Sequence, residues 1–410
     1  MYWSKNNYYL KKDEKVVIAN GDNGQWIRMS SEVYKIIKEI IQLELEIERT
    51  TEFFENKEDY DFIKSIYDDL CRARIIINKE IEDFNKIASI QLTNRCNLHC
   101  THCCVSAGDG DLVDLDKTDM KEIIDKVIRW NPKNIMLSGG EPLLYKNFFE
   151  ILSYIRTKYD GKIILSTNAL LINEKNVEQL LECVDAFEIS IDGVDEETCS
   201  LVRGKGVFDR VCQKIKLLQK QGANKINLSM IFSDKNDDLR PKFMELNKKL
   251  GTIAVCRSFT PVGRGLTNRA LLSNIGEDKS YISNDYLDKH NNEPFGVSTC
   301  RAGLRELFID YKGNIYPCPS YIDPRFVLGN ILKINNLNDL LNSKKNFTDK
   351  IRSNRGMNFI SRCEGCEVKP FCWTCPGELV NIYSENEFID RCKKKKPILV
   401  FRVWEKNINM

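Results

Sequence analysis

Residues 89–103 read SIQLTNRCNLHCTHC, and this stretch decides the fold expected for the whole chain. Its first four residues form a strand-like segment, and three cysteines follow directly, Cys96, Cys100 and Cys103, in the spacing C-x3-C-x2-C. Three thiolates on one loop can hold three irons of a [4Fe–4S] cluster, which normally takes four cysteines, so one iron is left open for a small molecule. A structural zinc site is the alternative. It would need Cys104 or His102 as a fourth ligand, and adjacent ligands such as Cys103 and Cys104 are difficult to place around one metal.

Strand-like and helical segments alternate regularly from residue 89 onward. The strand-like segments lie at residues 89–92, 135–137, 162–165, 187–191, 225–231 and 253–257, with helical patterns between them, for example at 119–130 and 207–221. Six strand–helix units predict an α/β fold, a partial (β/α)6 barrel over residues 87–262, with active-site loops after the C-terminal ends of the strands. Residues 263–299 are expected to form a bridge, and residues 300–410 an irregular, cysteine-rich domain.

The first 86 residues predict a separate small domain. Strands are expected at 8–10, 16–20 and 26–29, with a turn at 20–24 and two helices after them. The first helix has its apolar face at Val33, Ile36, Ile37, Ile40 and Ile41, and the second covers 59–71. This order is typical of a winged-helix-like domain. Its 14 Lys and Arg against 18 Asp and Glu, a net charge of −4, argue against nucleic-acid binding.

The composition limits the class of protein. The 410 residues are 42% hydrophobic and 29% charged, with a formal net charge of +2, which is typical of a globular chain without a general attraction to nucleic acid or anionic membranes. No signal-peptide-like segment opens the chain and no run approaches a membrane span, so a cytoplasmic protein is expected. In that compartment, 16 cysteines indicate metal-binding or catalytic sites rather than disulfides.

Polar motifs follow the next strands in order. Residues 138–142 read SGGEP after the second strand, 166–168 read STN after the third, 190–193 read SIDG after the fourth, and 201–204 read LVRG. Together with the three-cysteine loop, these motifs resemble the radical S-adenosylmethionine superfamily. The resemblance implies that S-adenosylmethionine chelates the open iron and is cleaved to a 5′-deoxyadenosyl radical. The implied cofactor contacts are His102, Gly139, Gly140, Glu141, Ser166, Asn168, Ser190, Asp192 and Arg203.

Each motif has an implied role in this resemblance. The SGGEP segment is similar to the one that holds the methionyl amino group, the STN and SIDG segments to those near the ribose, and the LVRG arginine to the one that reaches the cofactor carboxylate. His102 stands where the family usually has an aromatic residue, which implies stacking on the adenine. Without the resemblance, Asn168, Ser190 and Asp192 are ordinary turn and capping residues.

A second cysteine group fills the C-terminal third. It resembles the SPASM domain, which implies two auxiliary iron–sulfur clusters, of the [4Fe–4S] type. The implied ligands are Cys363, Cys366, Cys372 and Cys392 for one cluster, and Cys300, Cys318 and Cys375 for the other. The second set lacks a fourth cysteine, for which Cys256 is the only remote candidate, so an open iron is expected to bind a thiolate of the substrate. A zinc ribbon built from two C-x2-C pairs is the alternative.

This combination predicts a peptide-modifying radical enzyme. The N-terminal domain resembles the recognition domains of enzymes that act on ribosomally made peptides, and such domains bind a leader peptide at an exposed sheet edge, expected here near residues 16–20 or 26–29. The layout resembles the sactipeptide and ranthipeptide maturases. That resemblance implies thioether cross-links between a cysteine sulfur and a carbon, a precursor peptide as partner, and a flavodoxin- or ferredoxin-type electron donor.

Other functions stay open. Carbon–carbon cross-linking, other peptide oxidations and maturation of a quinone-cofactor precursor fit the same domains. Sulfatase maturation is disfavoured because Pro319, and not an aspartate, follows Cys318. An iron–sulfur redox-sensing regulator is an alternative of another class, but it would not need the series of cofactor-binding motifs.

Overall fold

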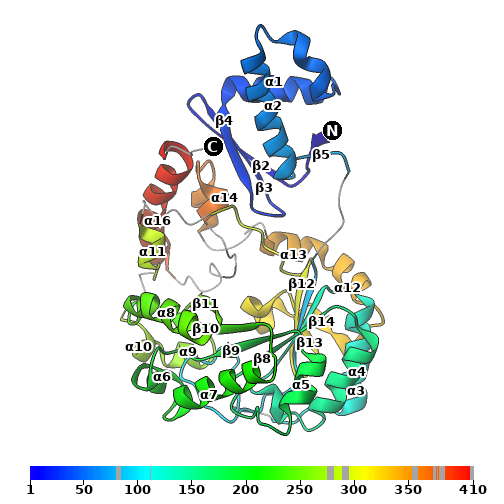
Figure 1. Ribbon diagram of the computed structural model, residues 1–410, viewed down its shortest axis with the longest axis vertical. Coiled ribbons are helices and arrows are strands. Elements are labelled where there is room, and N and C mark those ends of the chain that lie inside the picture. Colours follow the sequence, from blue (N-terminus) through cyan, green and yellow to red (C-terminus); the bar gives the residue numbers. More distant parts are fainter. Residues whose placement is uncertain are drawn as a thin grey trace.

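The computed structural model describes residues 1–79, 85–110, 112–274, 281–288, 295–352, 359–372, 375, 377 and 384–406. Figure 1 shows an N-terminal domain above a larger α/β domain, with the C-terminal helix α16 (Glu385–Val400) along one side. Within these described residues, no helix is long and apolar enough to cross a membrane.

Six parallel strands form the centre of the α/β domain, and each pairs with the next along the chain. They are β6 (Ile87–Gln91), β7 (Asn134–Ser138), β8 (Lys162–Thr167), β9 (Ala186–Ser190), β10 (Ile226–Phe232) and β11 (Ile253–Ser258). The helices that follow the strands are α3 (Lys117–Arg129), α4 (Phe148–Lys158), α5 (Val177–Cys183), α6 (Glu196–Arg203), α7 (Val207–Lys220) and α8 (Arg240–Leu250). The predicted α/β fold with a parallel sheet is confirmed.

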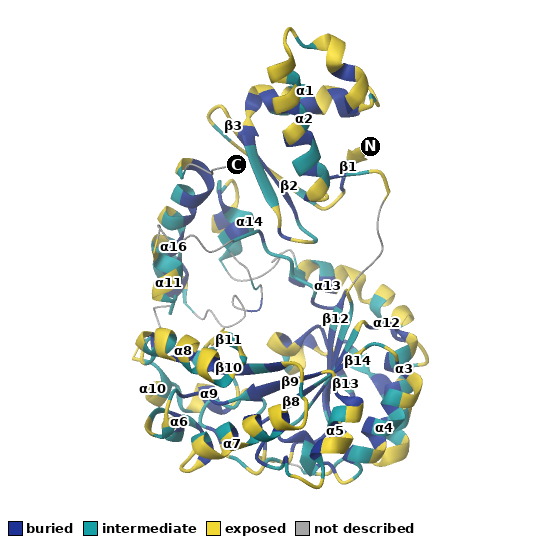
Figure 2. Ribbon diagram, in the orientation of Figure 1, coloured by how far each residue is buried: buried dark blue, intermediate teal, exposed yellow. Residues whose placement is uncertain are grey.

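Successive side chains along the strands alternate between a face packed against the helices and a polar face. Ile90, Leu137 and Leu165 are fully buried and share one core with the helices. Successive strand residues point to opposite faces, so Ser138 and Ser166, which follow two of these core residues, lie on the other face. Figure 2 shows the strands mostly buried and the outer helix surfaces exposed. The sheet therefore presents small polar side chains where the sequence predicts the cofactor.

The sheet extends beyond the six predicted strands. β12 (Glu306–Ile309) runs parallel beside β6, and β13 (Asn314–Tyr316) and β14 (Gly329–Asn330) continue it in antiparallel fashion to a total of nine strands. The sequence predicts only irregular structure after residue 300. These strands have two to four residues each, which is too short for an alternating pattern to be recognised. Pairing decides their conformation: β12 pairs with the edge of β6, β13 with β12, and β14 with β13.

The N-terminal domain follows the predicted order. It contains β1 (Tyr2–Trp3), β2 (Asn7–Lys12), β3 (Lys15–Asn20), β4 (Trp26–Ser30), α1 (Ser31–Gln42), α2 (Lys57–Arg72) and β5 (Ile76–Ile77). The side chains of Ser30 and Asn56 cap the two helices by accepting N–H bonds. On β3, Val16 and Ile18 pack against the helices, whereas Val17 and Ala19 pack against the C-terminal region. Burial of both faces explains the uninterrupted apolar run of this strand.

The expected edge strand at residues 16–20 is wrong. The sheet order is β2-β3-β4, so β3, which contains these residues, is the central strand. β4 is an edge strand, but its Arg28 side chain donates to the carbonyls of Val403 and Lys406 (both 2.9 Å), and Trp26 donates to that of Phe295 (2.9 Å). The C-terminal region thus lies along β4. β2 is the other edge, and no described strand pairs with its outer side.

Shorter elements make up the rest of the described chain. Helices α9 (Arg264–Thr267), α10 (Arg269–Leu272) and α11 (Asn284–Leu287) fall in the predicted bridge, of which residues 275–280 and 289–294 lie outside the described residues. The C-terminal region adds α12 (Leu337–Ser343), α13 (Lys345–Arg352) and α14 (Lys369–Cys372). The short 3-10 helices are η1 (Ile47–Phe53), η2 (Pro142–Leu144), η3 (Asp237–Leu239), η4 (Pro319–Tyr321), η5 (Pro324–Phe326), η6 (Ile331–Lys333) and η7 (Ile360–Cys363), and η8 (Phe401–Glu405) is a π-helical turn.

Candidate active site

The three cysteines after β6 lie near one another on one loop. Burial raises the pKa of the Cys96 thiol to about 11, and the neighbouring thiols of Cys100 and Cys103 add to the shift. The backbone N–H groups of Leu98 and Ala107 donate to the sulfurs of Cys96 (3.4 Å) and Cys103 (3.3 Å). Hydrogen bonds to the sulfurs are a standard feature of iron–sulfur sites. The loop therefore fits a cluster held by three thiolates.

Two arginines place positive charge beside the middle cysteine. Burial raises the pKa of the Cys100 thiol, and the guanidinium groups of Arg203 and Arg264 oppose that rise. A thiolate-bound cluster is anionic, so these cations compensate charge that would otherwise be buried alone.

The two glycines after β7 pack against the chain just before Cys96. A Cβ on Gly140 would lie 2.3 Å from the carbonyl oxygen of Arg95, and one on Gly139 would lie 2.9 Å from that of Thr93. The same two carbonyls accept backbone N–H bonds of 2.8 Å from Glu141 and Gly140. These glycines therefore let the turn after β7 approach the cluster loop closely. Their contact with the cofactor stays a prediction.

Glu141 is a fully buried carboxyl at the same turn. It accepts hydrogen bonds from the hydroxyl of Thr167 (2.7 Å) and the backbone N–H of Asn168 (2.9 Å). Burial raises the pKa of Glu141 to about 7, and these hydrogen bonds oppose the shift. A cation that binds beside such a group favours its ionised form. The site thus suits the ammonium group that the sequence assigns to it.

Asp192 joins three segments at the end of β9. Its Oδ2 accepts from His102 Nε2 (2.7 Å) and Arg203 Nε (2.7 Å), and its Oδ1 accepts from the backbone N–H of Ile231 (2.8 Å). Burial alone would raise the pKa of Asp192, but Arg203 and His102 outweigh it and hold the pKa well below its usual range. The residue has a left-handed backbone (φ 51°), which aspartate tolerates better than most residues. The expected roles of Asp192, His102 and Arg203 toward the cofactor stay predictions.

The other predicted cofactor residues lie at the same edge of the sheet. Asn168 is buried and donates from Nδ2 to Asn97 Oδ1 (2.7 Å), which ties the turn after β8 to the cluster loop. Ser190 ends β9, where its hydroxyl accepts from that of Ser229 (3.3 Å), and Ser166 lies near the end of β8. The structure therefore gathers the predicted residues from four successive strand ends around the three-cysteine loop.

The C-terminal cysteines form two neighbourhoods. Burial raises the pKa of the Cys318 thiol, and the nearby thiols of Cys375 and Cys300 add to the rise. Burial likewise raises the pKa of the Cys372 thiol, and the nearby thiols of Cys363 and Cys392 add to it. The backbone N–H of Cys366 donates to the carbonyl of Cys363 (3.2 Å), which places it at the second group. Burial raises the pKa of both Cys300 and Cys372 to about 11, so metal binding would displace protons there. Trp373 and Thr374, which separate two of the cysteines, lie outside the described residues.

Two residues beside the first of these groups are not predicted from the sequence. Glu306 lies next to Cys318, and burial raises the pKa of this carboxyl. Tyr321 is 1% exposed, and its hydroxyl has no hydrogen-bond partner within the described part of the chain. A lone acid at the start of the apolar stretch ELFI was the available signal for Glu306. Cys256, on β11, has Arg240, Asp237 and Asp285 as its charged neighbours, so the structure gives no support for it as a fourth ligand.

Arg264 is a third residue that the sequence analysis missed. It lies in the expected bridge, yet it is buried, and its guanidinium donates to the carbonyl of Cys100 (3.1 Å). The available signal was the Gly-Arg-Gly of residues 263–265, which comes soon after the sixth strand, the position of the other site motifs.

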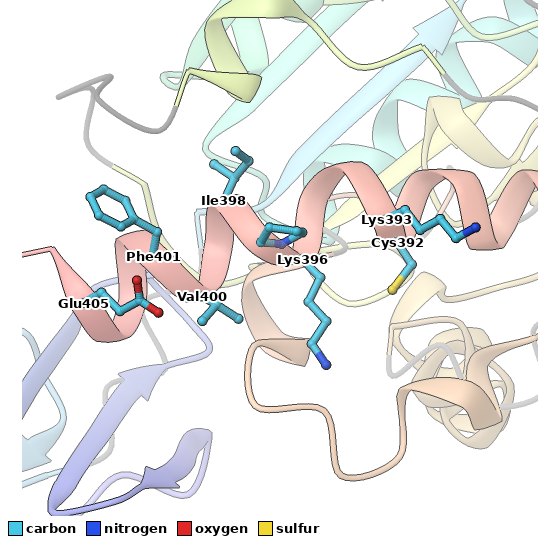
Figure 3. Close-up of a pocket in the computed structure, with 8 residues that line it drawn as sticks. Cys392, Lys393, Lys396, Ile398, Val400, Phe401 and Glu405 are labelled. Atoms are coloured by element: carbon cyan, nitrogen blue, oxygen red, sulfur yellow. The ribbon is translucent and has the colours of Figure 1, made fainter.

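Two cavities accompany these groups. One, of about 260 Å³, lies at the N-terminal ends of β6 to β10, opposite the cysteine loop, and Lys133, Lys162, Lys225 and Arg301 are among its lining residues. The other, of about 700 Å³, runs along α16 and η8 from Cys392 to Glu405 (Figure 3). Its lining comes from one helical segment and includes no predicted cofactor contact, so only its position beside Cys392 links it to the site.

Two family models match the chain, one over the three-cysteine loop with the strand-end motifs and one over most of the C-terminal cysteines. The model of the radical SAM superfamily matches residues 90–246, and that of the SPASM iron–sulfur cluster-binding domain matches residues 300–376. This chain contains a radical SAM domain and a SPASM domain. A radical SAM domain binds S-adenosylmethionine and a [4Fe–4S] cluster, and a SPASM domain binds auxiliary clusters, which the buried and hydrogen-bonded thiols described above can accommodate.

Individual relatives match part of this chain. Mycofactocin maturase MftC of Mycolicibacterium smegmatis is 29% identical over 261 residues, covering 59% of this chain and 66% of the relative. The antilisterial bacteriocin subtilosin biosynthesis protein AlbA of Bacillus subtilis is 26% identical over 306 residues, covering 70% of this chain and 66% of the relative. The chain thus spans just under two thirds of the length of these relatives. The crystal structure of Streptococcus suis SuiB bound to S-adenosylmethionine, at 16% identity, covers 94% of this chain and 98% of SuiB with a TM-score of 0.56, which shows a shared fold.

Proposed function

We propose that this protein is a peptide maturase that binds the leader of a ribosomally made precursor peptide and installs thioether cross-links in its core segment. The observation that carries the proposal is the fusion of the two cluster-binding domains to a small sheet domain with one open edge, β2. The resemblance to MftC, which is named a mycofactocin maturase, and to AlbA, which is named a bacteriocin biosynthesis protein, supports it.

The open edge of β2 suits an extended peptide. A strand added there would bond to the main chain of β2, and side-chain pockets would provide selectivity. The rings of Trp3, Tyr9 and Tyr34 lie beside this edge, with centroids 6.1 to 6.5 Å apart, and Tyr9 is 47% exposed. Leader binding at this position would raise the local concentration of the core segment at the barrel.

The 260 Å³ cavity at the far ends of the strands suits the entry of the core segment. Ile164 lines this cavity. Ser166 follows two residues later on the same, polar face of β8, about 7 Å along the strand. Three lysines and Arg301 line the cavity. Asp185 lines it too, but its carboxylate already accepts hydrogen bonds from Arg156 (2.6 Å) and from the backbone N–H of Ile163 (2.8 Å). The resulting positive charge favours a core segment with acidic side chains.

The proposed chemistry divides between the cofactors and the chain. When bound, the cluster and S-adenosylmethionine supply a 5′-deoxyadenosyl radical that takes one hydrogen atom from a substrate carbon. Glu141 would hold the methionyl ammonium, and Arg203, already fixed by Asp192, would face its carboxylate. Cys300, Cys318 and Cys375 would bind an auxiliary cluster through three thiolates, which leaves a position for the thiolate of a substrate cysteine. That cluster would also accept the electron that is released when the sulfur bonds to the carbon.

The decisive experiment is mass spectrometry of a cysteine-containing precursor peptide encoded beside the gene, after anaerobic incubation with reduced, iron-reconstituted protein and S-adenosylmethionine. A thioether removes two hydrogens per cross-link and also protects that cysteine from alkylation by iodoacetamide. Loss of two hydrogens with the cysteine still open to alkylation would replace the proposal by carbon–carbon cross-linking or dehydrogenation. Cleavage of S-adenosylmethionine without any change in the peptide would remove the maturase assignment.

The leader-binding step has its own control. Tyr9→Ala should raise the KM for the precursor about tenfold while leaving the peptide-independent cleavage of S-adenosylmethionine unchanged, because it removes one anchor of the β2 edge. Phe53→Ala, at an exposed position in the same domain, should change neither quantity. An unchanged KM in Tyr9→Ala would place leader binding elsewhere.

A further inference from the structure

Residues 263–268, which we call the clamp segment, lie against the three-cysteine loop rather than acting as a simple bridge. The segment follows β11 and contains α9 (Arg264–Thr267). The backbone N–H of Arg264 donates to the carbonyl of Cys103 (3.0 Å), and the Asn268 amide donates to that of Thr101 (3.0 Å). The clamp segment thus satisfies carbonyl groups on both sides of His102.

Arg264 makes the most extensive of these contacts. Its Nε donates to the carbonyl of Cys100 (3.1 Å), and its Nη1 donates to the carbonyl of Ala107 (2.7 Å) and the carboxylate of Asp109 (2.5 Å). Asp109 also contacts the ring of His99 (3.1 Å). A single guanidinium therefore spans the loop from its middle cysteine to a point beyond its last one.

Gly263 allows this segment to approach the loop. Its backbone has φ 54° and ψ −136°, a combination open mainly to glycine. A Cβ there would lie 2.6 Å from the carbonyl oxygen of Cys103 and 2.5 Å from that of Cys104. Any other residue at this position would push the clamp segment, and with it Arg264, away from the loop.

The loop needs such support because it has little structure of its own. No described residue between β6 and α3 belongs to a helix or strand, yet three thiols must be held in one arrangement. Arginine is suited to this task, since its planar fork donates to several acceptors at once and stays charged when buried. At 7% exposure, Arg264 has to keep these partners, because an unpaired buried charge is costly.

We propose that Arg264 is a positioning residue that presets the three-cysteine loop for the radical SAM cluster. It acts through the carbonyls of Cys100 and Ala107. The inference rests on the radical SAM domain and is independent of the peptide product.

The test compares Arg264→Gln and Arg264→Lys with Arg156→Gln in the full-length protein. Arg156 is a matched control, because it also donates to three carbonyls, those of Tyr159, Gly161 and Cys183, and to a carboxylate, but far from the cysteine loop. Hydrogen exchange of the cluster-free protein reports on the loop directly. Electron paramagnetic resonance of the reduced protein identifies the radical SAM cluster as the signal that changes when S-adenosylmethionine is added.

In Arg264→Gln, amides of residues 96–109 should exchange faster while those of the barrel strands do not, and chelators should remove the S-adenosylmethionine-responsive cluster about tenfold faster, as expected for loss of a supporting partner. Arg264→Lys, which keeps the charge but cannot span the loop, should be intermediate. Arg156→Gln should leave both readouts at the wild-type value. Wild-type exchange and cluster retention in Arg264→Gln, full retention in Arg264→Lys, or equal losses in Arg156→Gln would each overturn the proposal.

Discussion

The carboxylate of Asp192 connects the cluster loop, α6 and β10 through His102, Arg203 and Ile231. Asp192→Asn keeps the shape of the side chain but leaves Arg203 buried without its counter-charge. We expect it to lower the free energy of unfolding of the cluster-free protein by about 3 kcal/mol, measured by urea titration. The control is Asp195→Asn at the N-cap of α6, where asparagine caps as well as aspartate, so its effect should be below about 0.5 kcal/mol. Equal effects of the two variants would contradict the role of Asp192 as a charge partner.

Glu141 predicts a pH dependence. Its folded-state pKa of about 7 lies above its ordinary value of 4.5, so the folded protein binds the extra proton between these two values. Its contribution to stability is therefore fully present below about pH 4.5 and is lost as the pH rises through 7. Relative to Glu141→Gln, the wild-type cluster-free protein should lose on the order of 3 kcal/mol between pH 5 and pH 8, measured as the difference in unfolding free energy. Parallel pH profiles for the two proteins would show that Glu141 is already ionised at pH 5.

At the scale of elements, the turn between β9 and α6 depends on one glycine. A Cβ on Gly193 would lie 2.3 Å from the backbone nitrogen of Cys199 in α6. Gly193→Ala should therefore displace α6, which carries Arg203, and lower stability by about 2 kcal/mol in thermal unfolding. Gly222→Ala is the comparison, since that site has open space but φ 99°, so its cost of about 1 kcal/mol comes from backbone strain alone. A larger effect at Gly222 would mean that α6 can shift without cost.

At the scale of the whole molecule, the N-terminal domain is joined to the C-terminal region through an aromatic contact. The ring of Trp26 lies 5.3 Å from those of Phe295 and Phe371, and Arg28 binds the carbonyls of Val403 and Lys406. Trp26→Ala removes buried contact worth about 3 kcal/mol, so amides of β4 and of the end of α16 should exchange faster while those of β6 to β9 do not change. Phe62→Ala, which is half-exposed on α2, should leave exchange in both regions unaltered. Unchanged exchange in Trp26→Ala would show that the two regions are not coupled here.

The sequence by itself determined the parallel core and the positions of the site motifs. Strand-like segments that alternate with helical ones can form only a few architectures, and the carboxyl ends of parallel strands meet at one edge. Glu141, Asn168 and Asp192 can therefore be placed near the cysteine loop from the sequence alone. Their actual partners cannot, because the pairing of Asp192 with Arg203 and the burial of Glu141 depend on packing between turns that are far apart in the chain.

The tertiary structure alone decided the features that rest on long-range contacts. β12 to β14 are too short to carry a pattern; β12 forms because β6 offers it an open edge, and β13 and β14 extend the sheet from β12. The choice of β2 as the free edge follows from the C-terminal region lying along β4, more than 300 residues away in sequence. Arg264 looked like part of a linker because a single arginine has no periodicity, and only the folded chain brings it to the carbonyls of the cysteine loop. Local patterns specify elements, whereas partners separated by long stretches of chain are specified by the packing of those elements.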